Sequence, residues 1–157
     1  VLSPGLRVGW MIAPADLLAR ATMCKQFSDA HTSTFAQATA AQYLKAGRMP
    51  GTLAKVRAVY AERARTMGEA LRTELGDAIS FSQPGGGLFF WARLTGAGGK
   101  VQDGNELAKR AIEKGVAFVP GTPFFASQPD HATLRLSFAT ADVAKIREGV
   151  ARLGQAL

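Results

Sequence analysis

An apolar run at residues 7–13 is the first clear signal along the chain. It reads Arg-Val-Gly-Trp-Met-Ile-Ala, ends just before Pro14, and has the length and composition of a buried strand. After Pro14, apolar residues recur at helical spacing through Cys24, which predicts a helix with this cysteine on its apolar face. On such a face the thiol is better interpreted as a small buried hydrophobe than as a nucleophile.

A second helix is predicted by Thr34 and Gln37, which have the spacing of a capping box. This helix runs on to Gly47, a residue type that commonly follows the last helical turn. The two helices should therefore be separated by a break near residues 28–32.

A third helix should be much longer than the first two. After Pro50-Gly51, apolar residues step by three and four positions over residues 52–75, and Gly76 follows. At 1.5 Å per residue such a helix is about 35 Å long, which is enough to connect two domains.

From residue 77 onward, short apolar runs alternate with helical patterns, which predicts an α+β unit with a sheet covered by two helices. In the last apolar run, Leu134, Leu136 and Phe138 share one face, and Arg135 and Ser137 share the other. The predicted strands are residues 78–82, 88–94, 116–119 and 133–139, and the predicted helices are residues 102–114 and the segment from about 142 onward.

Composition excludes several classes of protein. The formal net charge of +7 is dispersed, with no run denser than Arg63-Ala64-Arg65, so we expect no nucleic-acid binding through this chain. One Cys excludes an internal disulfide, and one Cys with two His argues against a structural zinc site, so neither His31 nor His131 is taken as a metal ligand. No apolar stretch approaches the roughly 20 residues of a membrane span, and we expect a cytoplasmic protein.

Two arginines are candidates for chemistry. Arg7 at the start of the first apolar run is either a surface residue or a planar fork for two phosphate oxygens. Arg135 is either solvent-facing or aimed into a cleft, where it could bind a carboxylate with two hydrogen bonds. The glycines 85–87 precede no helix and no Lys-Ser or Lys-Thr pair, so a hairpin turn or a close backbone approach is a better interpretation than a phosphate loop.

Taken together, the motifs resemble class I/II pyridoxal-phosphate aminotransferases of fold type I. Lys25-Gln26 and residues 29–34 are similar to the branch that includes 2-aminoadipate and other broad-specificity aminotransferases. The four blocks that carry the resemblance, in order and in register, are residues 3–10, 84–91, 115–121 with Phe124-Phe125, and 134–139.

The resemblance implies roles for both arginines. Arg7 would bind the phosphate of pyridoxal 5'-phosphate, and Arg135 would bind the substrate α-carboxylate. In the family pattern the Schiff-base lysine lies seven positions before this first arginine, which is the residue immediately before Val1. The parent enzyme would move an amino group from an amino acid to a 2-oxo acid, which we expect to be 2-oxoglutarate, and would act as a homodimer.

The resemblance also implies a domain organisation between α/β and α+β. Residues 1–50 would be the C-terminal remnant of a large cofactor domain, residues 51–76 a connecting helix, and residues 77–157 a small α+β domain. Two alternatives stay open. One is the aminotransferase-like effector domain of a MocR-type transcription regulator, and the other is a stand-alone interaction domain without cofactor, in which residues 8–13 would find their strand partners within this chain.

Because no residue here matches the Schiff-base lysine, we expect the 157-residue chain alone to have no transaminase activity. The measurement is glutamate formation from an amino donor and 2-oxoglutarate in the presence of pyridoxal phosphate. An enzyme-like rate from this chain would contradict the assignment.

Overall fold

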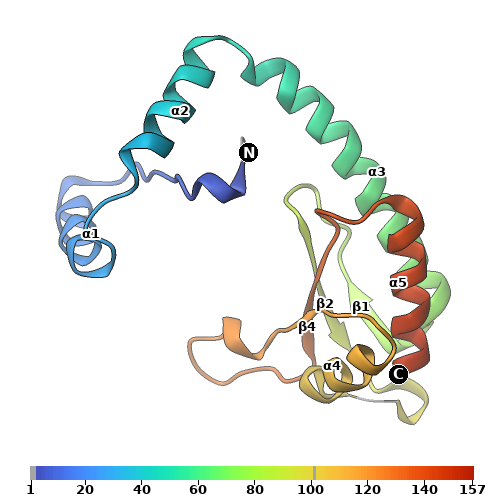
Figure 1. Ribbon diagram of the computed structural model, residues 1–157. Helices are drawn as coiled ribbons and strands as arrows, with labels where there is room; N and C mark the ends of the chain where they lie inside the picture. Colours follow the sequence, from blue (N-terminus) through green and yellow to red (C-terminus); the bar gives the residue numbers. More distant parts are fainter. Residues whose placement is uncertain (1–2, 101) are drawn as a thin grey trace. The chain divides into compact units, whose positions relative to one another are not determined.

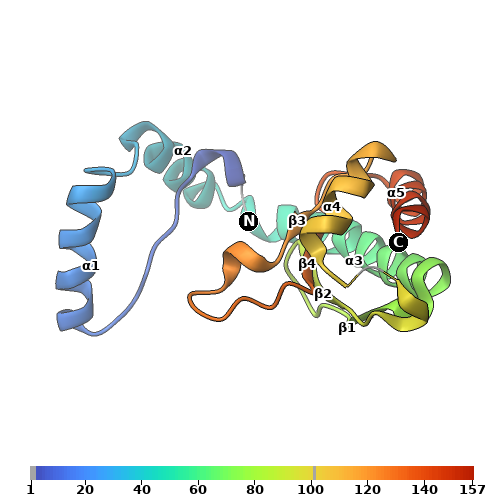
Figure 2. The ribbon, with the colours of Figure 1, turned by 90° about the horizontal axis from the view of Figure 1, so that it is seen from below.

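The computed structural model describes residues 3–100 and 102–157, which form two compact units that divide between Val56 and Arg57. Its α-helices and strands β1, β2 and β4 are labelled in Figure 1, and β3 is labelled in Figure 2. The helices of the first unit are a short 3-10 helix (Pro4–Leu6), α1 (Ala15–Ser28), α2 (Thr34–Lys45) and the beginning of α3 (Met49–Leu75). The rest of α3 and all later elements belong to the second unit.

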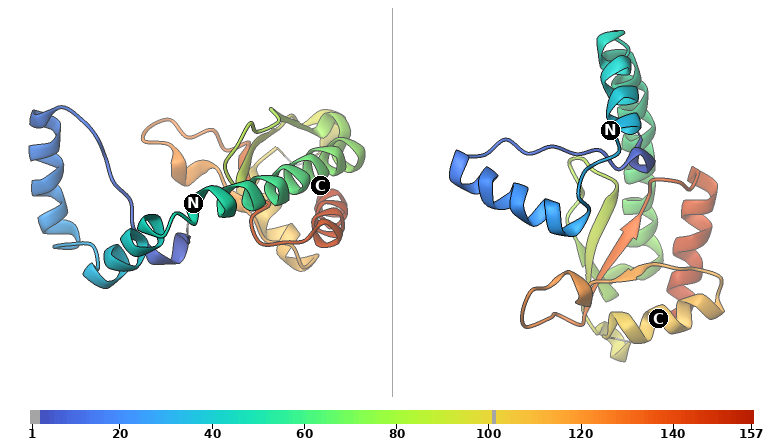
Figure 3. Two further views of the ribbon diagram at one scale, coloured as in Figure 1. Left: turned by 90° about the horizontal axis from the view of Figure 1, so that it is seen from above. Right: turned by 60° about the vertical axis from the view of Figure 1, so that its left-hand side comes forward.

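The prediction of a strand at residues 7–13 is wrong. Residues 7–14 form neither helix nor strand (Figure 3). Trp10 and Ile12 in this segment are 82% and 92% exposed. A strand exists only when a neighbour supplies partners for its backbone hydrogen bonds. No strand in the described part of the chain pairs with this segment, so its apolar composition alone does not make it a strand.

Helix α1 forms as predicted, but its apolar side chains are exposed. Within the part of the chain that the structure describes, no residue of α1 is buried, and the large side chains of Met23 and Phe27 are exposed. Cys24 is likewise exposed, which corrects the prediction of a buried thiol. The periodicity identified the helix correctly, but no layer of the described chain covers its apolar face.

Helix α2 begins where predicted, but its cap differs from the predicted one. The cap is Ser33, whose hydroxyl oxygen accepts a hydrogen bond from the Ala36 N–H at 3.4 Å. The Gln37 side chain donates to the Thr32 carbonyl at 2.9 Å, whereas a capping box needs this side chain to accept a backbone N–H. The break between the two helices lies where it was expected.

Helix α3 is three residues longer at its start than predicted. Pro50 lies in its first turn, where a missing N–H costs nothing because that donor has no helical partner. The helix ends at Leu75, and Gly76 follows with a φ of +52°. Neither α3 nor any other helix in the described residues is long and apolar enough to cross a membrane.

The second unit contains a four-stranded antiparallel sheet with strand order β1-β2-β4-β3. The strands are β1 (Ile79–Phe81), β2 (Phe89–Leu94), β3 (Val119–Pro120) and β4 (Thr133–Ser137). Strand β3 is shorter than the predicted 116–119 because the Val116 N–H donates to the Ala111 carbonyl at 2.9 Å and so closes the preceding helix. Antiparallel β1 and β2 make the glycines 85–87 part of a hairpin connection.

One face of the sheet packs against three helices, not two. These are α3, α4 (Gly104–Glu113) and α5 (Val143–Ala156), shown in Figures 1 and 2. Phe90, Ala92 and Leu94 alternate along β2 toward this core, and Leu134 and Leu136 do so along β4. The helices contribute Met67, Leu71, Leu107, Ala111, Ile146, Val150 and Leu153.

Backbone contacts fix where β4 begins. The Gly121 N–H donates to the Thr133 carbonyl at 2.7 Å, and the Gly104 N–H donates to the His131 carbonyl at the same distance. A Cβ at Gly121 would lie 2.6 Å from the Thr133 Cβ and 2.9 Å from its carbonyl carbon. Both neighbours are held by the sheet, so there is no room for a side chain at position 121.

We expect Gly121→Ala to lower the free energy of unfolding by about 1–3 kcal/mol, as overpacking of a buried site does. The matched control is Gly85→Ala, because nothing lies within 4 Å of a Cβ there. Urea unfolding of both variants checks this. Equal midpoints for the two would contradict the close approach.

Asp130 holds the turn that leads into β4. Its carboxylate accepts hydrogen bonds from Arg93 Nε at 2.9 Å and from the Ala132 N–H at 3.0 Å. Its carbonyl accepts from the Thr133 hydroxyl at 2.7 Å. The Arg93 guanidinium, followed by the Ala132 N–H, holds the pKa of Asp130 below its ordinary value of 3.8.

Because this pKa is lower in the folded chain than in the unfolded one, ionised Asp130 stabilises the fold above the unfolded pKa. That contribution is lost as the pH falls through the folded pKa. We therefore expect Asp130→Asn to flatten the loss of stability on acidification from about pH 5 downward, measured by urea unfolding. Part of the slope should remain, because a hydrogen bond from the Asn105 N–H lowers the pKa of Asp103 as well. An unchanged slope in Asp130→Asn would contradict this role.

Candidate functional site

Arg135 lies in the middle of the sheet, on the face opposite the core. Strand β4 is flanked by β2 and β3, and Arg135 is paired with Trp91 on one side and with Val119 on the other. Its neighbours Leu134 and Leu136 are buried on the core face, so strand alternation directs the arginine to the outer face. The side chain is half-buried there.

Aromatic rings surround this arginine. Its Cζ lies over the Phe89 ring at 4.2 Å from the centroid and over the Phe124 ring at 4.5 Å. Trp91 packs on Phe124 and Phe125, with centroids 5.7 and 6.1 Å apart. We call Phe89, Trp91, Phe124 and Phe125 the aromatic wall. All four residues are partly exposed, so the wall is accessible.

Arg135 has no acidic partner among the described residues, since no carboxylate there lies within 4.0 Å of its guanidinium. Its Nε is buried and forms no hydrogen bond. Arg93 lies on the same face of β2 as Trp91, but its charge is already paired with Asp130. A half-buried guanidinium without acceptors is costly unless a ligand supplies them, and a carboxylate matches its fork of donors.

Arg7 belongs to the first unit and lines an open hollow of about 400 Å³. Its backbone is in the left-handed region, with φ +54° and ψ +28°, and its N–H donates to the Pro4 carbonyl at 3.1 Å. This conformation is unfavourable for a residue with a Cβ, and such strain is typical of functional sites. The hollow is also lined by Gly5, Leu6, Asp29, His31, Thr32, Ser33 and Ala36.

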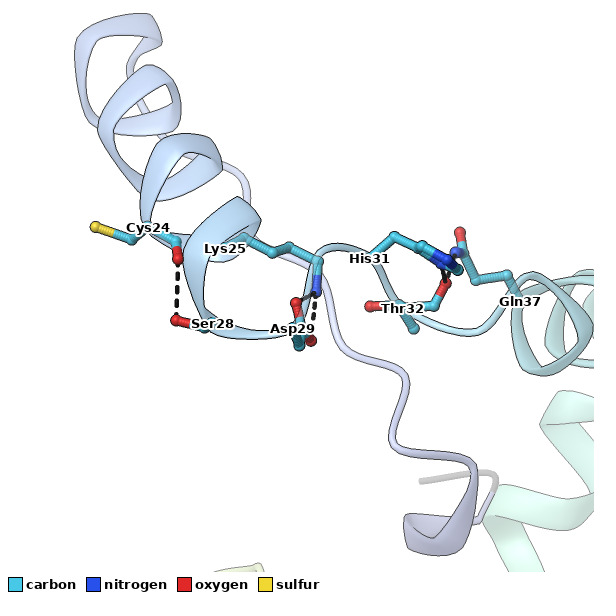
Figure 4. A network of polar contacts seen from close by, with 7 residues as sticks. All are labelled: Cys24, Lys25, Ser28, Asp29, His31, Thr32 and Gln37. Atoms are coloured by element: carbon cyan, nitrogen blue, oxygen red, sulfur yellow. Dashed lines mark hydrogen bonds and ion pairs between the residues drawn. The ribbon is translucent and has the colours of Figure 1, made fainter.

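The turn between α1 and α2 supplies the other wall of the hollow, and Figure 4 shows its polar contacts. Lys25 Nζ lies 2.9 Å from both carboxylate oxygens of Asp29, so the negative charge of this aspartate is already balanced. The Thr32 carbonyl lies 2.9 Å from both His31 Nδ1 and Gln37 Nε2. Arg7 forms no ion pair within the described residues, and with the N-terminus of α2 beside it the hollow favours an anion.

The aromatic partners of Arg135 were not predicted from the sequence. Phe89 and Trp91 alternate with the buried Phe90, so apolar residues occupy both faces of β2. That pattern is the available signal, because an apolar outer face on an antiparallel strand needs a reason of its own. Phe124 is the last residue of a short 3-10 helix after β3, and its position over Arg135 depends on tertiary structure alone.

Comparisons with known proteins identify the family of this chain. The family described as aminotransferase class I and II matches residues 2–153. The chain is 43% identical over its full length to a 2-aminoadipate transaminase of Thermus thermophilus, of which it covers 38%. It is 32% identical to the HTH-type transcriptional regulator TauR of Rhodobacter capsulatus, with 99% of this chain and 31% of that protein covered.

Among solved structures, the α-aminoadipate aminotransferase LysN of Thermus thermophilus, complexed with N-(5'-phosphopyridoxyl)-L-leucine, matches with a TM-score of 0.86. The match has 43% identity and covers 100% of this chain and 39% of that one. The chain thus spans about two fifths or less of the length of these relatives. Since the family match takes in nearly every residue, it confirms the resemblance found in the sequence, and the chain belongs to the class I and II aminotransferases.

Proposed function

We propose that this chain is the C-terminal part of a pyridoxal-phosphate-dependent aminotransferase, which moves an amino group from an amino acid to a 2-oxo acid such as 2-oxoglutarate. The observation that carries the proposal is the guanidinium of Arg135, which lies in an accessible aromatic wall without an acidic partner in the described chain. Amino acids and 2-oxo acids share an α-carboxylate, so one arginine fork can serve both halves of the reaction.

The residues present suit the cofactor's phosphate. Arg7 is a permanently charged fork, strained in its backbone, in a hollow next to a helix N-terminus. When bound, pyridoxal phosphate supplies an aldehyde carbon that takes up the amino group and an electron-withdrawing ring that stabilises negative charge at the substrate Cα. Arg7 would hold the phosphate and Arg135 the substrate carboxylate. Neither arginine transfers a proton. We therefore expect the proton-transferring lysine to be a residue other than those of this chain.

We propose for this chain the domain organisation that its resemblance to fold type I aminotransferases implies. Residues 1–50 would be part of a large cofactor domain, residues 51–76 a connecting helix and residues 77–157 a small domain. The boundary between the two units, at Val56 and Arg57, falls within α3 and supports this division. We also propose that the parent protein is a cytoplasmic homodimer, whose oligomeric state gel filtration with light scattering would measure.

A MocR-type regulator is the second candidate function, because TauR aligns over nearly the whole chain. The higher identity to a transaminase, 43% against 32%, favours the enzyme. A parent protein that binds DNA and turns over no amino acid would be the regulator. The stand-alone domain is less well supported, because residues 8–13 find no strand partner among the described residues.

Arg135→Lys in the parent protein tests the enzyme. Lysine keeps the charge but loses the planar fork, so we expect kcat/KM for the amino donor to fall by roughly 10–100-fold. Arg110→Lys is the matched control, because Arg110 lies on the surface of α4 and pairs with Glu106. Steady-state transaminase kinetics measure both variants. Activity of Arg135→Lys within twofold of the unaltered enzyme would contradict the carboxylate role.

A further inference from the structure

We propose that Phe124, together with Phe89, is a positioning residue that sets the orientation in which Arg135 presents its donors to a carboxylate. The inference rests on the proposed role of Arg135 and adds a requirement to it. A carboxylate should bind through the two terminal nitrogens, Nη1 and Nη2, and not through the Nε edge of the guanidinium.

The orientation follows from which nitrogens are accessible. Arg135 Nε is the buried side-chain atom without a hydrogen-bond partner among the described residues. Nη1 and Nη2 are not among the buried side-chain atoms that lack a hydrogen-bond partner. No protein group in the described chain accepts a hydrogen bond from either nitrogen. They therefore retain contact with solvent and are free to donate. A pair of parallel N–H bonds from Nη1 and Nη2 matches the two oxygens of a carboxylate.

The aromatic rings keep the arginine in this orientation. The Cζ distances of 4.2 Å to Phe89 and 4.5 Å to Phe124 are within the range of cation–π contacts. An unrestrained arginine has several rotatable bonds and would lose their freedom when a ligand binds. Because the rings already restrain the guanidinium, less conformational freedom remains to be lost when the carboxylate binds.

Phe124 is the ring that can be changed without disturbing the sheet. Phe89 lies within β2, opposite Ser137, whereas Phe124 ends a short 3-10 helix and is 48% exposed. That helix is anchored by its own contact, since Asn105 Nδ2 donates to the Thr122 hydroxyl at 3.2 Å. Replacing the ring therefore removes its contacts with Arg135 and Trp91 and leaves the local backbone supported.

The experiment compares Phe124→Leu, Phe124→Tyr and Ile112→Ala in the full-length parent enzyme. Ile112 lies on α4, is 65% exposed and is not part of the aromatic wall, so it is the control for the loss of an exposed apolar side chain. We expect Phe124→Leu to raise KM for both the amino acid and the 2-oxo acid about fivefold, with kcat within twofold. Phe124→Tyr keeps a ring and should restore KM, and Ile112→Ala should leave KM unchanged for both substrates.

The inhibition constant of an unreactive monocarboxylate, 4-methylvalerate, gives a second readout that does not depend on turnover. It should rise with Phe124→Leu in the same proportion as KM. A fall in kcat with KM and the inhibition constant unchanged would overturn the proposal, and so would an equal effect of Ile112→Ala. If Arg135→Lys impairs the enzyme while Phe124→Leu does not, only the positioning role fails. If neither variant has an effect, the carboxylate role itself fails.

Discussion

The guanidinium of Arg135 is a positive charge held against aromatic rings, with no carboxylate in the described chain to balance it. Its strand lies between two others, so its backbone is hydrogen-bonded on both sides. On the other face of the same strand, Leu134 and Leu136 point into a core that is shared with three helices. One short segment therefore combines a rigid anchor on one face with an unpaired donor on the other.

Distant backbone contacts hold that segment in register. The Asp130 turn fixes the start of β4, and Gly121 approaches Thr133 too closely to carry a side chain. Gly104, at the beginning of α4, is pressed against the Thr133 carbonyl in the same way, with its potential Cβ 2.7 Å from that oxygen. Since Phe124 follows soon after Gly121, the contact that fixes the strand also brings an aromatic ring toward Arg135.

Periodicity predicted this part of the molecule well and the first unit less well. Alternation over residues 133–139 placed Arg135 opposite the core, and the steps over residues 52–75 identified α3, because both patterns reflect burial within the chain. The same reasoning failed for residues 7–13 and for Cys24, where apolar residues meet no covering layer among the described residues. A pattern shows which face is apolar, whereas the identity of its partner, including the rings around Arg135, depends on tertiary structure.

The two units differ in how much of their own apolar surface they bury. The second closes a continuous core, whereas Ala36 is the one buried residue among positions 3–56, with Trp10, Ile12 and Phe27 all largely exposed. Burying one such side chain is worth about 1.5–3 kcal/mol, so these exposed residues represent a large unused stabilisation. The strained backbone of Arg7 must be held in place by packed neighbours, and the first unit provides few such neighbours. This asymmetry supports our proposal that the first unit belongs to a larger cofactor domain, in which its apolar surface would be covered and Arg7 would be held in position for a phosphate.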